Sequence, residues 1–357
     1  MMQDILSMEY IMISIFFLLA CESKSTDTTA AEPSTEDTQT EDTTTSEPSS
    51  DDTSSSEPST EDTATSEEID ITDIVLDSRS GNCVEYVQSS ISNVLDVKRD
   101  MAFSGSFVVT LASDKCLFSS NAIPNHDFND GNAQFATGVS EKSISYEMVQ
   151  SPTQETEATG LNLMYDNAIF LNGVKLDLLA AACYGVGPDP LGQEKIGCSD
   201  ASTPWRYDPM FAGNNFGTDG HNAHTQPDGT YHYHGDPMAL YDDGGSVESP
   251  VIGFAADGFP IFGPYIDDNG SARKVVSGYT LKSGERVSMS GEGAFPGGDY
   301  DGTFRDDYQY TGAGDLDECN GMERDGVYGY YITDSYPWVL ACFKGSPDSS
   351  FQKGMPE

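Results

Sequence analysis

Short segments in which apolar and polar residues alternate, separated by turn residues, dominate the chain beyond residue 69. An Asn-Gly pair at 172–173 divides the segment 168–178 into two alternating runs, and an Asp-Gly pair at 257–258 divides 251–262 in the same way. Such pairs between alternating runs are the strongest local signal for a β-hairpin. Two further strands are predicted by the same alternation, at 144–148 and 328–333.

One segment near residue 90 follows a different period. Its apolar residues are spaced as one stripe along a helix, and they are Val84, Val87, Ile91, Val94 and Leu95. We therefore expect one N-terminal helix, with strands after it. The predicted fold class is all-β or β-rich α+β, built from short antiparallel strands and hairpins.

The charge of the chain excludes one class of partner. Acidic residues outnumber basic ones by 59 to 17, which gives a formal net charge of −42. Nucleic acids are bound by clustered cations, and no run of Lys or Arg is longer than two, so we predict no nucleic-acid partner. The GxGxxG, P-loop and GxSxG motifs of phosphate-binding and hydrolase folds are also absent from the sequence.

The first 20 residues are typical of an export signal. Residues 11–20 form an apolar run of ten, about half the length that spans a bilayer. The run ends in Leu18-Leu19-Ala20-Cys21, which resembles the lipobox of bacterial lipoproteins, in which the Cys is lipid-modified. We expect a signal peptide over 1–20 and an anchor at Cys21. An ordinary cleaved signal peptide, with Cys21 incidental, is the alternative.

The segment 21–76 has the composition of a disordered spacer. Residues 22–78 include 18 acids and one base among Ser, Thr, Pro and Ala, and the sequence EPSTEDT occurs at 32–38 and 57–63. Such a segment buries too little apolar surface to offset the entropy of ordering. We expect a long acidic linker, followed by one β-rich domain over 77–357.

The cysteine count supports a lipid anchor and an oxidising compartment. The chain has seven Cys, and an odd thiol in an exported protein needs an explanation. With Cys21 as the anchor, six remain. Pairing between near neighbours predicts three disulfides, namely Cys83 with Cys116, Cys183 with Cys198, and Cys319 with Cys342.

Four of the five His lie within residues 221–234. His232 and His234 are spaced as i and i+2, which places both imidazoles on one face of a strand. The upstream Pro227-Asp228-Gly229 fits a three-residue hairpin loop, and that loop pairs His224 with His232. His221 is out of phase with His224 and is expected to point away.

Three imidazoles on one face could hold a transition metal. We predict that His224, His232 and His234 converge with His126, which lies in a turn-rich loop. Nitrogen donors favour Zn or Cu over Ca. Acidic loops near 267–270, 299–301 and 315–318 do not follow an EF-hand register and are more typical of solvated turns. The alternative for the His residues is a polar pocket in which they bind carboxylates.

Several segments together resemble one family, the YHYH family of exported bacterial and algal proteins. The resemblance covers roughly 121–351 and rests on QPDGTYHYHG, SPVIGFAADGFPIFGPY, GGDYDGTFRDDYQY, GDLDECNG and YPWVLACFKG. The residues that match its motif are His126, His224, and Tyr231 to His234. The resemblance implies an exported β-rich domain, and it implies no reaction or ligand.

Two classes of function follow from these observations. The first is a lipoprotein tethered to the bilayer through Cys21, outside the cytoplasm at the outer membrane or cell surface, with a His-rich metal site. The second is an enzyme, either a metal-dependent hydrolase or a copper oxidoreductase, that acts on an extracellular substrate. A metal-free module that binds a small molecule, a glycan or a protein is a further alternative.

Overall fold

The computed structural model describes residues 68–187, 197–291 and 293–354. The predicted signal peptide and Cys21 lie outside these ranges. Within them, no helix is both long and apolar enough to cross a membrane. The described part is β-rich, as predicted, with short strands and single turns of 3-10 helix.

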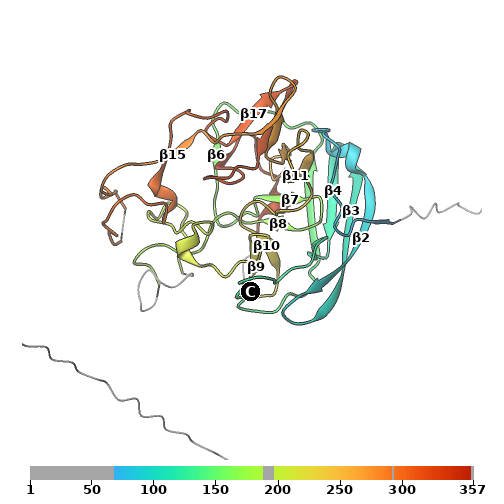
Figure 1. Cartoon of the computed structure of the whole chain (residues 1–357), viewed down its shortest axis with the longest axis horizontal. Coiled ribbons are helices and arrows are strands. Elements are labelled where there is room, and N and C mark those ends of the chain that lie inside the picture. Colours follow the sequence, from blue (N-terminus) through green and yellow to red (C-terminus); the bar gives the residue numbers. More distant parts are fainter. Residues whose placement is uncertain (1–67, 188–196, 292, 355–357) are drawn as a thin grey trace, which may run out of the picture. The chain divides into compact units, whose positions relative to one another are not determined.

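One sheet has five strands in the order β1-β2-β3-β4-β5, and its strands β2, β3 and β4 lie side by side in Figure 1. Its strands are β1 (Ile69–Asp70), β2 (Gln88–Asp96), β3 (Met101–Ala112), β4 (Lys115–Ser120) and β5 (Ile144–Val149). β1 pairs with β2 in parallel, and the remaining pairs are antiparallel. The predicted strand at 144–148 is thus confirmed.

The predicted helix over 84–95 is wrong. A 3-10 turn, η1 (Cys83–Tyr86), is followed directly by β2. The inner face of β2 carries Ser90, Ser92 and Asp96 around Val94, all of them buried. Because these inward residues are mostly polar, the period of two is hidden in the sequence, and the apolar residues of both faces imitate a helical stripe.

The predicted spacer extends too far along the chain. Its last part, 69–76, belongs to the folded domain, since Ile69 and Asp70 pair with β2 and Ile71 is buried. The backbone N–H of Leu76 donates to the carbonyl of Leu240 at 2.9 Å. The domain therefore begins near residue 69 rather than 77.

A second sheet has eight strands in the order β17-β18-β12-β11-β7-β8-β10-β9, and Figure 1 shows β11, β7, β8, β10 and β9 following one another in this order. In chain order they are β7 (Ala168–Phe170), β8 (Lys175–Leu176), β9 (Ala223–Thr225), β10 (Tyr231–Tyr233), β11 (Val251–Ala255), β12 (Pro260–Phe262), β17 (Gly321–Arg324) and β18 (Val327–Tyr331). The pairs β8–β10 and β12–β18 are parallel, and the other five are antiparallel.

The two hairpins predicted from Asn-Gly and Asp-Gly pairs are confirmed, as is the late strand. β7 and β8 join through Gly173, and β11 and β12 join through Gly258. Both glycines have positive φ, of 83° and 89°. That conformation is costly for a residue with a Cβ, which explains the glycine at each turn.

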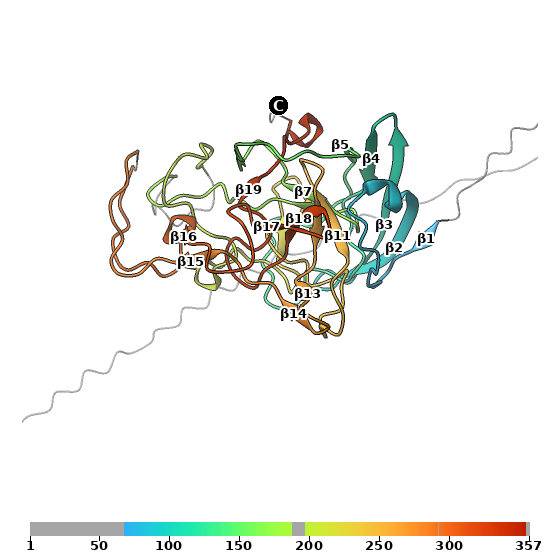
Figure 2. The ribbon, with the colours of Figure 1, turned by 90° about the horizontal axis from the view of Figure 1, so that it is seen from above.

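The remaining elements are three two-stranded ribbons and short 3-10 turns (Figure 2). The ribbons are β13 (Tyr265–Asp267) with β14 (Ala272–Lys274), β15 (Tyr279–Leu281) with β16 (Tyr308–Tyr310), and β19 (Cys342–Phe343) with β6 (Thr159–Gly160). The turns after η1 are η2 (Ala212–Asn214), η3 (Arg305–Asp307) and η4 (Ser349–Phe351).

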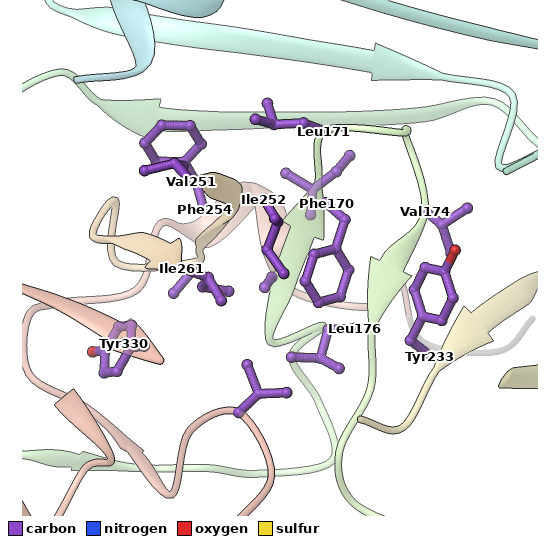
Figure 3. Close-up of a cluster of buried hydrophobic side chains, with 14 of the residues drawn as sticks. Phe170, Leu171, Val174, Leu176, Tyr233, Val251, Ile252, Phe254, Ile261 and Tyr330 are labelled. Carbon is purple, nitrogen blue, oxygen red and sulfur yellow. The ribbon is translucent and has the colours of Figure 1, made fainter. Parts of the chain in front are cut away.

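The core lies around the eight-stranded sheet and between it and the five-stranded sheet. Phe170, Ile252 and Ile261 are fully buried on neighbouring strands of the larger sheet (Figure 3). Phe118 of β4 contacts Phe254 of β11 with ring centroids 6.0 Å apart, which joins the two sheets. The larger sheet is thereby held rigidly, and its β9–β10 end carries the clustered His.

Three disulfides fasten the loops to this core, and their pairing is the predicted one. Cys83 bonds to Cys116, Cys183 to Cys198, and Cys319 to Cys342. Disulfides are typical of proteins that fold in an oxidising compartment.

Candidate metal centre

The β9–β10 hairpin has the predicted turn and register. His224 lies directly opposite His232. The N–H of Gln226 donates to the carbonyl of Thr230 at 2.9 Å, which closes the loop Pro227–Gly229. Gly229 has a φ of +89°, as a three-residue loop of this type requires.

Three imidazoles converge on one side of this hairpin. Nε2 of His234 lies 3.0 Å from Nε2 of His224 and 3.2 Å from Nε2 of His232. One ligand atom from each residue lies within 4.8 Å of the others. Nitrogen atoms bound tetrahedrally at the usual zinc distance are about 3.3 Å apart. The two separations from His234 are therefore close to those that a metal ion would impose.

The backbone orients these rings with Nε2 towards the centre. Nδ1 of His224 donates to the carbonyl of Phe216 at 2.7 Å, and Nδ1 of His232 donates to that of Thr230 at 3.3 Å. Since a carbonyl only accepts, each Nδ1 carries the proton and each Nε2 keeps its lone pair. Metal-binding His is usually oriented in this way.

The third ring is less firmly held. Nδ1 of His234 is buried and has no hydrogen-bond partner among the described residues. Burial, His224 and Lys353 lower the pKa of His234, and the backbone of Asp177 opposes this shift.

Burial keeps two of the three rings neutral. His232 and His234 are 2% and 4% exposed. Burial, and then the neighbouring imidazoles, hold the pKa of both residues well below the usual range. A transition metal binds the neutral imidazole, so these two rings are in the ligating form at neutral pH.

The prediction that His126 joins this cluster is wrong. Its Nε2 lies 2.6 Å from the hydroxyl of Tyr233, a residue that points to the opposite face of β10. Its ring stacks on that of His221, with centroids 3.6 Å apart. His126 and His221 thus form a pair behind the hairpin, and only His221 was expected to be outside the site.

The two tyrosines of the motif are core residues. Tyr231 and Tyr233 are both 0% exposed. The hydroxyl of Tyr231 donates to Asp219 at 2.8 Å, and that of Tyr233 accepts from the amide of Asn172 at 2.9 Å. They anchor the rear face of the strand that carries His232 and His234.

A buried polar network beside the His cluster was not predicted. It comprises Asp166, Lys175, Asp177, Gln226 and Lys353, which are joined by ion pairs and hydrogen bonds. Burial raises the pKa of Asp177, and the nearby Lys353 opposes that shift. The sequence does carry one signal, since Lys175 and Asp177 alternate with apolar residues in an otherwise buried strand.

One arginine forms ion pairs with acidic residues of two of the acidic loops. Arg273 pairs with Asp268 at 2.7 Å and with Asp315 at 2.8 Å. Asp267 accepts from the N–H of Gly270 at 2.7 Å, as in an ordinary turn. These contacts agree with the expectation that the acidic loops are solvated turns.

The region that contains this site matches a model of one protein family. A family model described as YHYH protein matches residues 145–345, which is more than half of the 357-residue chain. The match includes all eight strands of the larger sheet and the β9–β10 hairpin. No curated protein and no solved structure matches the chain.

Proposed function

The chain belongs to the YHYH protein family, and we propose that its domain binds one transition metal ion, zinc or copper, through His224, His232 and His234. The observation that carries this proposal is the spacing of 3.0 and 3.2 Å between the Nε2 atoms. The Nδ1 contacts of His224 and His232 with backbone carbonyls direct their Nε2 atoms to this centre, which supports the proposal.

The donor set supports zinc or copper over harder ions. Imidazole nitrogen suits both metals, whereas calcium and magnesium require oxygen ligands. Three protein ligands also leave a fourth position open, as in catalytic zinc sites. A site of this kind is able to polarise a substrate or activate water. For this chain, the donor set supports binding of the ion.

The metal-binding domain is proposed to stand outside the cytoplasm on a lipid tether. The three disulfides fit export to an oxidising compartment. The tether itself is supported by the sequence around Cys21 and by the acidic segment that follows it. A domain held in this way would meet metal ions or other material at the cell surface.

Metal analysis of paired variants tests the proposal. Wild-type protein, His232→Gln and His221→Gln are stripped with a chelator, exposed to zinc or copper, desalted, and measured by elemental analysis. We expect about one equivalent in the wild type and in His221→Gln, and less than a tenth of that in His232→Gln. Equal metal content in all three would refute the site. A wild type that takes up no metal would favour the metal-free binding module.

A further inference from the structure

One side of the candidate metal centre is formed by strand β8. Lys175 is the register partner of His232, and the N–H of Asp177 donates to the carbonyl of Tyr233 at 2.9 Å. Adjacent strands lie about 4.8 Å apart, and alternate residues share a face. Asp177 therefore lies next to His234 on the same face of the sheet as the three ligands.

The two lysines on this face already have hydrogen-bond partners within the protein. Lys175 donates to Asp166 at 2.8 Å and to the amide oxygen of Gln226 at 3.1 Å. Lys353 pairs with Oδ2 of Asp177, and Gln226 donates to the same oxygen at 3.0 Å. Neither lysine is left without an acidic partner, so this face is not built to receive an anion.

One carboxylate oxygen of Asp177 has no donor in this network. Oδ1 of Asp177 is buried and has no hydrogen-bond partner among the described residues. In Asp166, by contrast, both carboxylate oxygens have a donor: Oδ1 accepts from Lys175, and Oδ2 accepts from Tyr146 at 2.7 Å. A buried carboxylate oxygen without a donor is costly, and no donor among the described residues offsets this cost.

We propose that Asp177 Oδ1 receives a hydrogen bond from a neutral ligand, in the resting protein a water molecule, at the fourth position of the metal centre. The inference rests on the proposed metal site and adds the chemical class of its exchangeable ligand. Asp177 is then a positioning residue: it selects a ligand that carries a hydrogen and repels an anion. Water and alcohols are favoured at this position over azide and similar ions.

Azide binding to cobalt-loaded protein tests this selection, because cobalt(II) reports its ligands in the visible spectrum. The variants are Asp177→Asn and the matched control Asp166→Asn, which removes the same charge from the same network. Asp177→Asn should bind one equivalent of cobalt and should bind azide at least tenfold more tightly than the wild type, since a repelling charge is replaced by an amide. Asp166→Asn should change azide affinity less than threefold.

The outcomes separate this inference from the proposed function. If the wild type takes up no cobalt, the metal site itself is refuted. If cobalt binds but the two variants alter azide affinity equally, or neither alters it, Asp177 has no special relation to the fourth position. If Asp177→Asn does not fold, a crystal structure of the zinc-loaded wild type tests the same contact between Asp177 and the metal-bound ligand. It should show a metal-bound water within about 3 Å of Oδ1, and a protein atom in that position would overturn the inference.

Discussion

His224 and His232 face each other across the β9–β10 hairpin, with ring centroids 4.8 Å apart. Each ring is held by a different carbonyl, that of Phe216 for the first and that of Thr230 for the second. The pair is therefore fixed both by the register of the hairpin and by contacts beyond it.

The hairpin loop sets the register, so a change there should act on metal affinity. A Cβ at Gly229 would lie 2.5 Å from Oγ of Ser140 and 2.9 Å from the carbonyl oxygen of Gly138, and φ there is +89°. Gly229→Ala should lose about 1–2 kcal/mol of stability and at least tenfold in zinc affinity. Urea unfolding and a chelator competition assay measure the two effects.

Gly270→Ala is the matched control. Gly270 has the same φ of +89°, but a Cβ there would meet no atom within 4 Å, and the residue lies outside the hairpin. It should lose a similar amount of stability from backbone strain and keep wild-type zinc affinity. Unchanged zinc affinity in Gly229→Ala would show that the register does not depend on this loop.

The hydrogen bonds of Tyr233 on the rear face of the hairpin should contribute to the stability of the fold and should not affect metal binding. Tyr233→Phe removes hydrogen bonds to both His126 and Asn172, which stay buried. We expect a loss of about 1–3 kcal/mol in the free energy of unfolding. Tyr231→Phe should cost less, because Oδ2 of Asp219 keeps the N–H of Asn129 as a donor.

The two Tyr variants also test the division between the faces of β10. Both should retain one equivalent of zinc. A Tyr233→Phe protein that folds normally but binds no zinc would place the rear pair of imidazoles in the site after all.

The sequence predicted the local part of this site well. The loop Pro227–Gly229, the pairing of His224 with His232 and the shared face of His234 all follow from turn chemistry and a period of two. These features are determined by about ten consecutive residues, so the local sequence is enough to predict them. The disulfides were equally local, with separations of 33, 15 and 23 residues.

The parts that the sequence did not predict depend on distant contacts. His126 lies about a hundred residues before the hairpin, and nothing in its own segment tells which face of β10 it will reach. The β2 segment imitates a helical stripe because its inner face is polar, and the Ser92 hydroxyl on that face donates to the distant carbonyl of Pro124 at 2.8 Å. Likewise, Lys353 reaches Asp177 from the C-terminal end of the domain.

His126 should make the metal-free protein acid-sensitive. Burial, followed by the adjacent His221, lowers the pKa of His126 to about 3 from 6.5. Between these values the unfolded chain binds a proton that the folded chain does not, so stability falls as the pH falls. The contribution is about 1.4 kcal/mol per pH unit within that window.

Removing the imidazole should remove this contribution. In His126→Gln, the plot of unfolding free energy against pH between 5.5 and 4 should be shallower than in the wild type by about 1.4 kcal/mol per unit. Urea titrations at several pH values give the slopes. Identical slopes would mean that His126 is protonated in the folded state or exposed there.

The tether is open to a direct test in a bacterial host. Cys21→Ala removes the thiol on which lipid attachment depends, so the protein should move from the membrane fraction to the soluble extracytoplasmic fraction. Immunoblots of separated fractions measure the change, and Ser23→Ala is the matched control, a substitution beside Cys21 that keeps the thiol. Wild-type membrane association of Cys21→Ala would contradict the lipid anchor.

X-ray absorption at the metal edge of zinc-loaded protein tests the central claim most directly. The account predicts three imidazole nitrogens at about 2.0–2.1 Å and one further light ligand, with the imidazole signal lost in His232→Gln. A spectrum with sulfur ligands, with oxygen ligands alone, or with the same imidazole signal in that variant would contradict the proposed site.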